Sequence, residues 1–172
     1  IKSETDGLML SANAPNMLQI MSDNGILSEI LPVKNYYIDL HLQAVSLCEQ
    51  FNITPSLPLI YAVLFMRSEN NTFSNLIDLK FSKAHANIIM KMHLLMELQD
   101  SQDLMYSLKN IWLEEKDFIQ YFIFSSLVFK DNQYIYNLYL ELEGRELPVF
   151  PIVGDDILIL GYQGKDVGRI LG

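Results

Sequence analysis

The distribution of glycine constrains the fold of this chain more than any other feature. Six of the eight glycines lie from Gly144 to the C-terminus, and none occurs between Gly25 and Gly144. Glycine is the residue that adopts left-handed backbone conformations without steric cost, so the long glycine-free stretch needs few special turns. We therefore expect regular secondary structure in the middle of the chain and tight turns near its C-terminal end.

Apolar residues recur at helical spacing through the glycine-free stretch, and clusters of asparagine, serine and aspartate separate the periodic segments. The segment 57–67 is apolar almost all round, as a central helix would be. The segments 115–129 and 132–143 contain many β-branched and aromatic residues, so β-strands are an alternative there. The pattern predicts an all-α fold with helices over 16–31 (interrupted by a turn at Asp23-Asn24-Gly25), 37–51, 57–67, 82–98 (capped by Ser82 or Ser74), 102–112, 115–129 and 132–143.

Length and hydrophobicity bound the class of protein. The chain has 172 residues, half of them hydrophobic, which suits one domain, or one domain and a remnant, with a sizeable core. The longest apolar runs, 57–66 and 118–129, are shorter than the roughly 20 residues needed to cross a bilayer, so we expect no membrane partner. Since the chain starts with Ile1 and shows no basic segment followed by an apolar one, we expect no signal peptide and a longer parent reading frame.

The residues with metal-binding or nucleophilic chemistry are few. Cys48 is the single cysteine, so we expect a reducing, cytoplasmic setting and a thiol that serves as a small buried hydrophobe. His41, His85 and His93 show no spacing typical of metal ligands. We predict core or boundary roles for His85 and His93, and no metal site.

The C-terminal glycines favour a pair of short helices. Asp155 and Asp156 suit a helix start, and Gly161 would end that helix. A turn from Gly164 to Gly168 would then lead into a second helix over 166–171. The free N–H groups at its start could bind an anion such as a phosphate, with Lys165 and Arg169 on either side. The alternative is a plain helical corner whose glycines permit close packing and whose cations are solvated.

The charge of the chain opposes extensive contact with nucleic acid. Its 21 acidic and 12 basic residues give a net charge of −9, and no run of basic residues interleaves with aromatic ones. Any RNA contact must therefore be local. Lys80, Lys83 and Lys91 form the one loose basic cluster, which is either an RNA contact or a solvated helix surface.

Three segments carry a resemblance to a known family. The C-terminal pattern, Phe150-Pro-Ile-x-Gly-Asp-Asp-Ile-x-x-x-Gly-x-x-Gly-x-x-x-Gly-x-x-Leu, resembles the C-terminal signature of bacterial class II tRNA nucleotidyltransferases (CCA-adding enzymes) and poly(A) polymerases. Residues 17–32, a leucine-rich segment that reaches a glycine and then Leu-Pro, look like the exit from the neck of these enzymes. Residues 76–86, with Leu-Lys-Phe-Ser-Lys, are similar to a helix of their body. The likeness spans nearly the whole chain.

The resemblance implies a neck remnant at 1–32, a helical body at 33–147 and the start of a tail at 148–172. In this family the body and tail hold the tRNA elbow so that the 3′ end reaches a catalytic head. The implied RNA contacts are Gly164, Lys165, Gly168, Arg169, Lys80 and Lys83.

Catalytic residues are not implied for this chain. The family's head holds magnesium ions and nucleoside triphosphates through a Gly-Gly-x-x-Arg-Asp motif and an Asp-x-Asp motif, and it selects the base through Glu-Asp-x-x-Arg. All three motifs are missing here. We therefore expect no cofactor in this chain and no polymerisation by the chain alone.

Two departures leave other functions open. The neck pattern carries Gly7 where the family has lysine, which should weaken a helix there. The acidity of the chain favours a protein-interaction module that docks a separately encoded head polypeptide. A decayed remnant that folds without a task is the third alternative. CCA addition and poly(A) addition are not distinguished by these residues.

Overall fold

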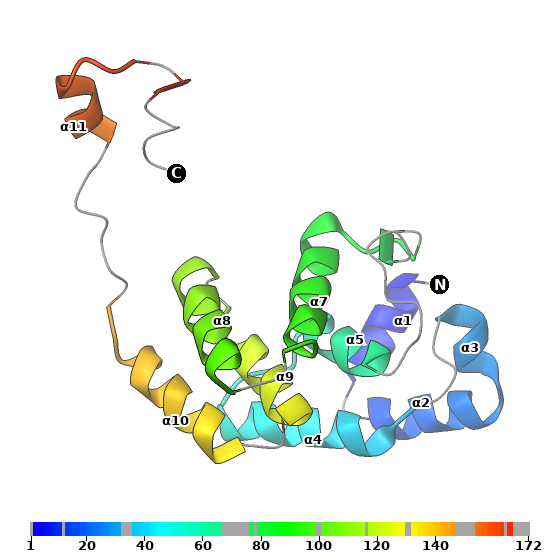
Figure 1. Cartoon of the computed structure of the whole chain (residues 1–172). Helices are drawn as coiled ribbons and strands as arrows, with labels where there is room; N and C mark the ends of the chain where they lie inside the picture. The colour runs from blue at the N-terminus through cyan, green and yellow to red at the C-terminus, as the bar shows by residue number, and fades with distance from the viewer. Residues whose placement is uncertain are drawn as a thin grey trace.

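All regular secondary structure in the described part of the chain is helical, which confirms the all-α prediction (Figure 1). The computed structural model describes residues 2–11, 13–31, 36–66, 76–77, 79–98, 101–115, 117–129, 132–146, 154–163 and 165–166. The strand alternative is wrong, because 119–129 and 132–143 both form helices. The helices are α1 (Lys2–Met9), α2 (Ala14–Asp23), α3 (Ile26–Ile30), α4 (Ile38–Gln50), α5 (Leu57–Phe65), α7 (Lys83–Leu95), α8 (Ser101–Glu114), α9 (Ile119–Phe129), α10 (Asn132–Glu143) and α11 (Gly154–Ile159).

Helices α5 and α9 form the centre of the body. Every residue of α5 from Pro58 to Phe65 is buried, and the helix packs against α1, α4, α7 and α9. Helix α9 also contacts α4, α7, α8 and α10, and it is buried from Gln120 to Leu127. A helix that is apolar all round is stable only where other helices surround it, as these two are.

Side-chain caps fix the start of two helices. The Oγ of Ser56 accepts a hydrogen bond from the N–H of Leu59 at 3.3 Å, and Ser82 does the same for His85 at 3.1 Å. Ser82 is therefore one of the two predicted caps, while Ser74 lies outside the described residues. The predicted turn between α2 and α3 also forms, with Gly25 at φ +70°.

The N-terminal helix forms in spite of Gly7. Helix α1 continues through this residue to Met9, which is 2 % exposed. The hydroxyl of Tyr61 on α5 donates to Asp6 at 2.8 Å. These tertiary contacts offset the low helix propensity of glycine. Leu18 of α2 and Leu27 of α3 belong to the same hydrophobic cluster as the later helices.

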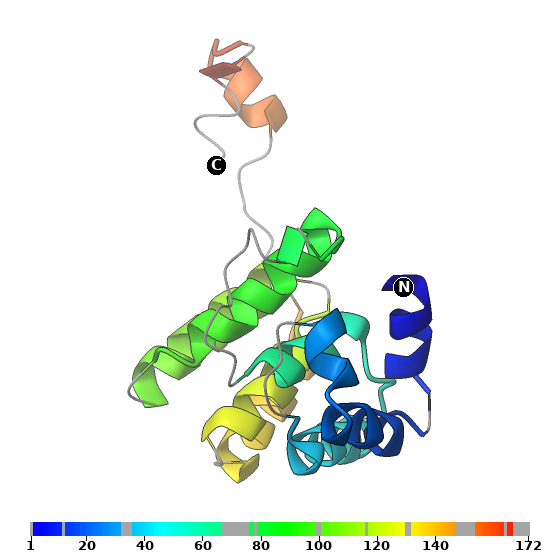
Figure 2. The same ribbon diagram turned by 90° about the vertical axis from the view of Figure 1, so that its right-hand side faces the viewer.

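Helix α11 stands apart from the other helices in both views (Figures 1 and 2). Its Ile157 is buried but lies outside the main hydrophobic cluster. No helix in the described part of the chain has both the length and the apolar character that a membrane crossing requires.

Candidate functional site

Lys80 and Lys83 lie on either side of the cap of α7. Both side chains are exposed, and Lys80 has a left-handed backbone at φ +66°. Its N–H donates to the carbonyl of Ile77 at 2.8 Å, in the turn that precedes the helix. The two predicted contacts are thus neighbours at a helix start, where the dipole adds positive potential.

Lys91, the third lysine of the predicted basic cluster, is paired with carboxylates. Its Nζ forms a short hydrogen-bonded ion pair with Glu115 and lies 3.6 Å from Glu114. The pair with Glu115 raises the pKa of Lys91. With two acidic neighbours, Lys91 adds little positive potential to the start of α7.

The C-terminal motif is described only in part. Helix α11 begins at Gly154 and is followed by Gly161 at φ +91°, as the sequence predicted. Lys165 is exposed and lies in a helical turn with Asp166. Gly164, Gly168 and Arg169 lie outside the described residues, so the predicted anion site is present only through Lys165. Figures 1 and 2 show α11 apart from the start of α7, so the two sets of predicted contacts are not brought together.

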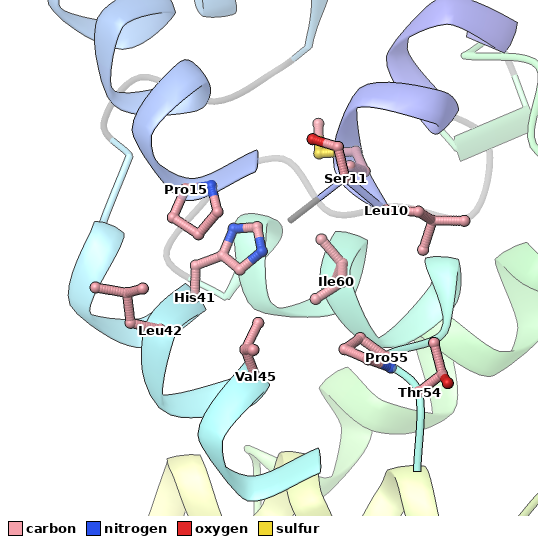
Figure 3. A pocket seen from close by; sticks show the side chains of 10 residues that line it. Leu10, Ser11, Pro15, His41, Leu42, Val45, Thr54, Pro55 and Ile60 are labelled. Carbon is pink, nitrogen blue, oxygen red and sulfur yellow. The ribbon is translucent and has the colours of Figure 1, made fainter. Parts of the chain in front are cut away.

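A pocket that the sequence analysis did not predict lies where α1, α2, α4 and α5 converge (Figure 3). Its volume is about 210 Å³. The lining contains no charged side chain among the described residues: it consists of apolar Met9, Leu10, Pro15, Leu42, Val45, Pro55 and Ile60, with polar Ser11, His41 and Thr54.

The pocket has a buried floor and an exposed rim. Met9, Pro15, His41 and Ile60 are buried, whereas Leu10 and Leu42 are 51 % and 49 % exposed. In Figure 3 the imidazole of His41 lies between the side chains of Pro15 and Ile60. A small molecule could therefore reach the imidazole from solvent past the two leucines.

His41 is the polar group at the centre of the pocket floor. Its Nδ1 lies 2.8 Å from the hydroxyl of Tyr36, and the side chain is 1 % exposed. Burial lowers the pKa of His41 to about 4 and raises the pKa of Tyr36. The imidazole is therefore neutral at physiological pH, and the phenol keeps its proton.

The sequence analysis assigned no role to His41 and did not predict the pocket. The lining residues span positions 9 to 60 and come from four helices and two connections. Periodicity shows which face of one helix is apolar, but it does not show where four such faces fail to fill the space between them. Only the tertiary arrangement reveals the cavity.

The other candidate groups occupy structural positions. Cys48 is fully buried, and burial raises the pKa of its thiol to about 11, so the predicted hydrophobic role fits its surroundings. The Nε2 of His93 lies 3.0 Å from the carbonyl oxygen of Ala62, and its ring stacks on Phe124. In the described residues no three His, Cys, Asp or Glu side chains gather as metal ligands would.

No family model, curated protein or solved structure matches this chain.

Proposed function

We propose that this chain is the RNA-holding body and tail base of a protein of the tRNA nucleotidyltransferase and poly(A) polymerase type. In this role it binds tRNA, or the 3′ region of another RNA, and positions the 3′ end for a nucleotidyltransferase head that this sequence lacks. The chain does not polymerise nucleotides by itself. Its contacts are phosphate contacts, through Lys165 and Arg169 in the tail and Lys80 and Lys83 in the body.

The C-terminal motif is the observation that supports this proposal. Its glycines and charges exceed what a packing helix requires, and its described part has the short helix and glycine stop that the motif predicts. The exposure of Lys165 leaves its ammonium group free to approach a phosphate.

The magnesium ions and nucleoside triphosphates of the family's reaction belong to the head. The donor set here does not fit them, because the described carboxylates are not gathered into a cluster of three or more potential metal ligands. No step of this function is therefore assigned to a metal ion in this chain.

The first experiment is a tRNA binding titration of the purified chain at low and moderate salt, repeated with a head polypeptide from the same source. Binding by the chain alone is the expected result. Association with the head without any RNA affinity, alone or together, would overturn the proposal and favour a docking function.

A double variant tests the tail contacts. Lys165→Ala/Arg169→Ala should weaken tRNA binding and reduce the salt dependence by roughly one unit of log–log slope per lost phosphate contact. The matched control is Lys109→Ala/Arg145→Ala, which removes the same charges from α8 and the end of α10. Equal losses in both variants would show a general charge effect and contradict the tail assignment.

A second function, docking of a separately encoded head, is favoured by the apolar surface of the tail. Leu158, Ile159 and Leu160 are 50 %, 83 % and 71 % exposed. Isolated exposed apolar residues are ordinary, but three in succession suit a protein contact. If the chain docks a head polypeptide, Ile159→Ser/Leu160→Ser should abolish that association. If the chain holds RNA, the same variant should leave tRNA affinity unchanged.

A further inference from the structure

We propose that the pocket around His41 binds a small uncharged molecule with an apolar body and one carbonyl oxygen, which accepts a hydrogen bond from Nε2 of His41. This inference does not depend on the RNA-holding function. It rests on the size of the pocket, the chemistry of its lining and an imidazole nitrogen that has no hydrogen-bond partner among the described residues.

We assign the hydroxyl of Tyr36 as the donor in its hydrogen bond to Nδ1 of His41, 2.8 Å away. With the phenol as acceptor, both its own hydrogen and Nε2 of His41 would lack a partner among the described residues, whereas with the phenol as donor only Nε2 does. A neutral imidazole that accepts at Nδ1 carries its hydrogen at Nε2. The histidine therefore presents a donor, not an acceptor, at its second nitrogen.

The Nε2–H group has no hydrogen-bond partner among the described residues. His41 lines the pocket and Tyr36 does not, so Nε2 is the nitrogen left to face the cavity. The side chain is 1 % exposed, but Nε2 is not one of the fully buried, unpartnered side-chain atoms of the described residues, which are Tyr121 Oη and Ser125 Oγ. This nitrogen therefore borders the pocket, and a ligand oxygen there would accept its hydrogen, which makes the site selective for an acceptor.

Volume and charge define the rest of the ligand. A cavity of about 150 Å³ is enough for benzene, and this one measures about 210 Å³. One six-membered ring with a short substituent therefore fits. No described residue of the lining is charged, so an ionic ligand group would find no counter-charge among them, which favours a neutral ligand.

Acetophenone is the probe, and α-methylstyrene, which has a methylene group in place of the carbonyl oxygen, is its matched control. Both are titrated into the ¹⁵N-labelled chain while the amide signals of Leu42, Val45 and Ile60 and the imidazole signals of His41 are followed by NMR. We expect acetophenone to shift these signals at millimolar concentration. It should bind about fivefold to tenfold more tightly than α-methylstyrene, the ratio for one neutral hydrogen bond.

Three variants locate the probe. Tyr36→Phe/His41→Phe removes both polar partners together, which preserves the fold better than leaving one unpaired, and it should abolish the preference for the carbonyl. Val45→Phe fills the cavity and should abolish binding of both probes. His85→Phe makes the same His-to-Phe change at the start of α7 and should leave binding unchanged.

Several results would overturn the inference. These are the absence of any shift at millimolar acetophenone, equal affinity for the two probes, and a carbonyl preference that survives in Tyr36→Phe/His41→Phe. Unchanged binding in the folded Val45→Phe variant would place the probe outside this pocket and would also overturn the inference.

Discussion

The hydroxyl of Tyr36 lies 2.8 Å from Nδ1 of His41, and both side chains are buried at the start of α4. Their rings meet edge to face, with centroids 6.0 Å apart and planes at 86°. A polar pair in an apolar setting is stable when its members satisfy each other. The same histidine therefore belongs both to the buried polar pair and to the lining of the pocket.

Stability should fall as the pH drops below the ordinary pKa of histidine. Burial lowers the pKa of His41 from its ordinary value of 6.5 to about 4 and also lowers that of His93. At a pH between these two pKa values, His41 is protonated in the unfolded chain and neutral in the folded chain. The free energy of unfolding therefore decreases as the pH decreases. For His41 the loss is about 2 kcal/mol between about pH 8 and about pH 5.

Urea unfolding at a series of pH values measures this loss, and ¹⁵N–¹H spectra of the imidazole report the titration of His41 directly. In His41→Gln the free energy of unfolding should decrease less over the same pH interval, because this variant lacks the buried imidazole. A folded-state titration of His41 near its ordinary value would contradict the prediction.

Two adjacent serines in α9 should respond oppositely to the same substitution. The Oγ of Ser125 is buried without a hydrogen-bond partner among the described residues, whereas Ser126 donates to the carbonyl of Phe122 at 3.0 Å. Ser125→Ala should raise the free energy of unfolding by about 1 kcal/mol, because it removes an unsatisfied hydroxyl. Ser126→Ala should lower it by about 0.5–1 kcal/mol. Chemical denaturation of the two variants makes the comparison, and destabilisation by Ser125→Ala would point to a partner for its hydroxyl.

The elements of the body that depend on local sequence were predictable. The Ser82 cap, the turn at Gly25 and the all-apolar helix α5 each follow from residues within one or two turns of each other. The stop of α11 at Gly161 was predictable for the same reason. Helix α1 was not predicted, because the contact between Tyr61 and Asp6 that holds it joins positions far apart in sequence.

The sites were less predictable than the elements. The proximity of Lys80 and Lys83 follows from the helix start at Ser82, but the pairing of Lys91 with Glu115 depends on how α7 lies beside the end of α8. The pocket was harder still to predict, because a cavity forms where several helices leave a volume between them unfilled. Residue spacing along the chain does not indicate where this happens.

The cap of α5 should contribute more stability than the cap of α7. Ser56 accepts from Leu59 and also donates to Gln120 on α9 at 2.6 Å, whereas Ser82 caps an exposed helix start. Gln120 is 5 % exposed, so Ser56→Ala leaves a buried amide oxygen without this donor. We expect a loss of about 2–3 kcal/mol for Ser56→Ala and about 1 kcal/mol for Ser82→Ala. Denaturant midpoints measured side by side give the difference, and equal losses would mean that the bond to Gln120 adds nothing.

Gly7 and Gly25 should respond in opposite directions to alanine. A Cβ at either position would meet no atom within 4 Å, so sterics with neighbours do not decide the outcome. Gly7 lies inside α1, where alanine stabilises a helix by about 0.5–1 kcal/mol. Gly25 has φ +70°, where a side chain costs about 1–2 kcal/mol. Thermal unfolding should therefore shift upward for Gly7→Ala and downward for Gly25→Ala. A lower midpoint for Gly7→Ala would show that residue 7 is not helical in solution. It would also count against the assignment of residues 1–32 as a neck remnant.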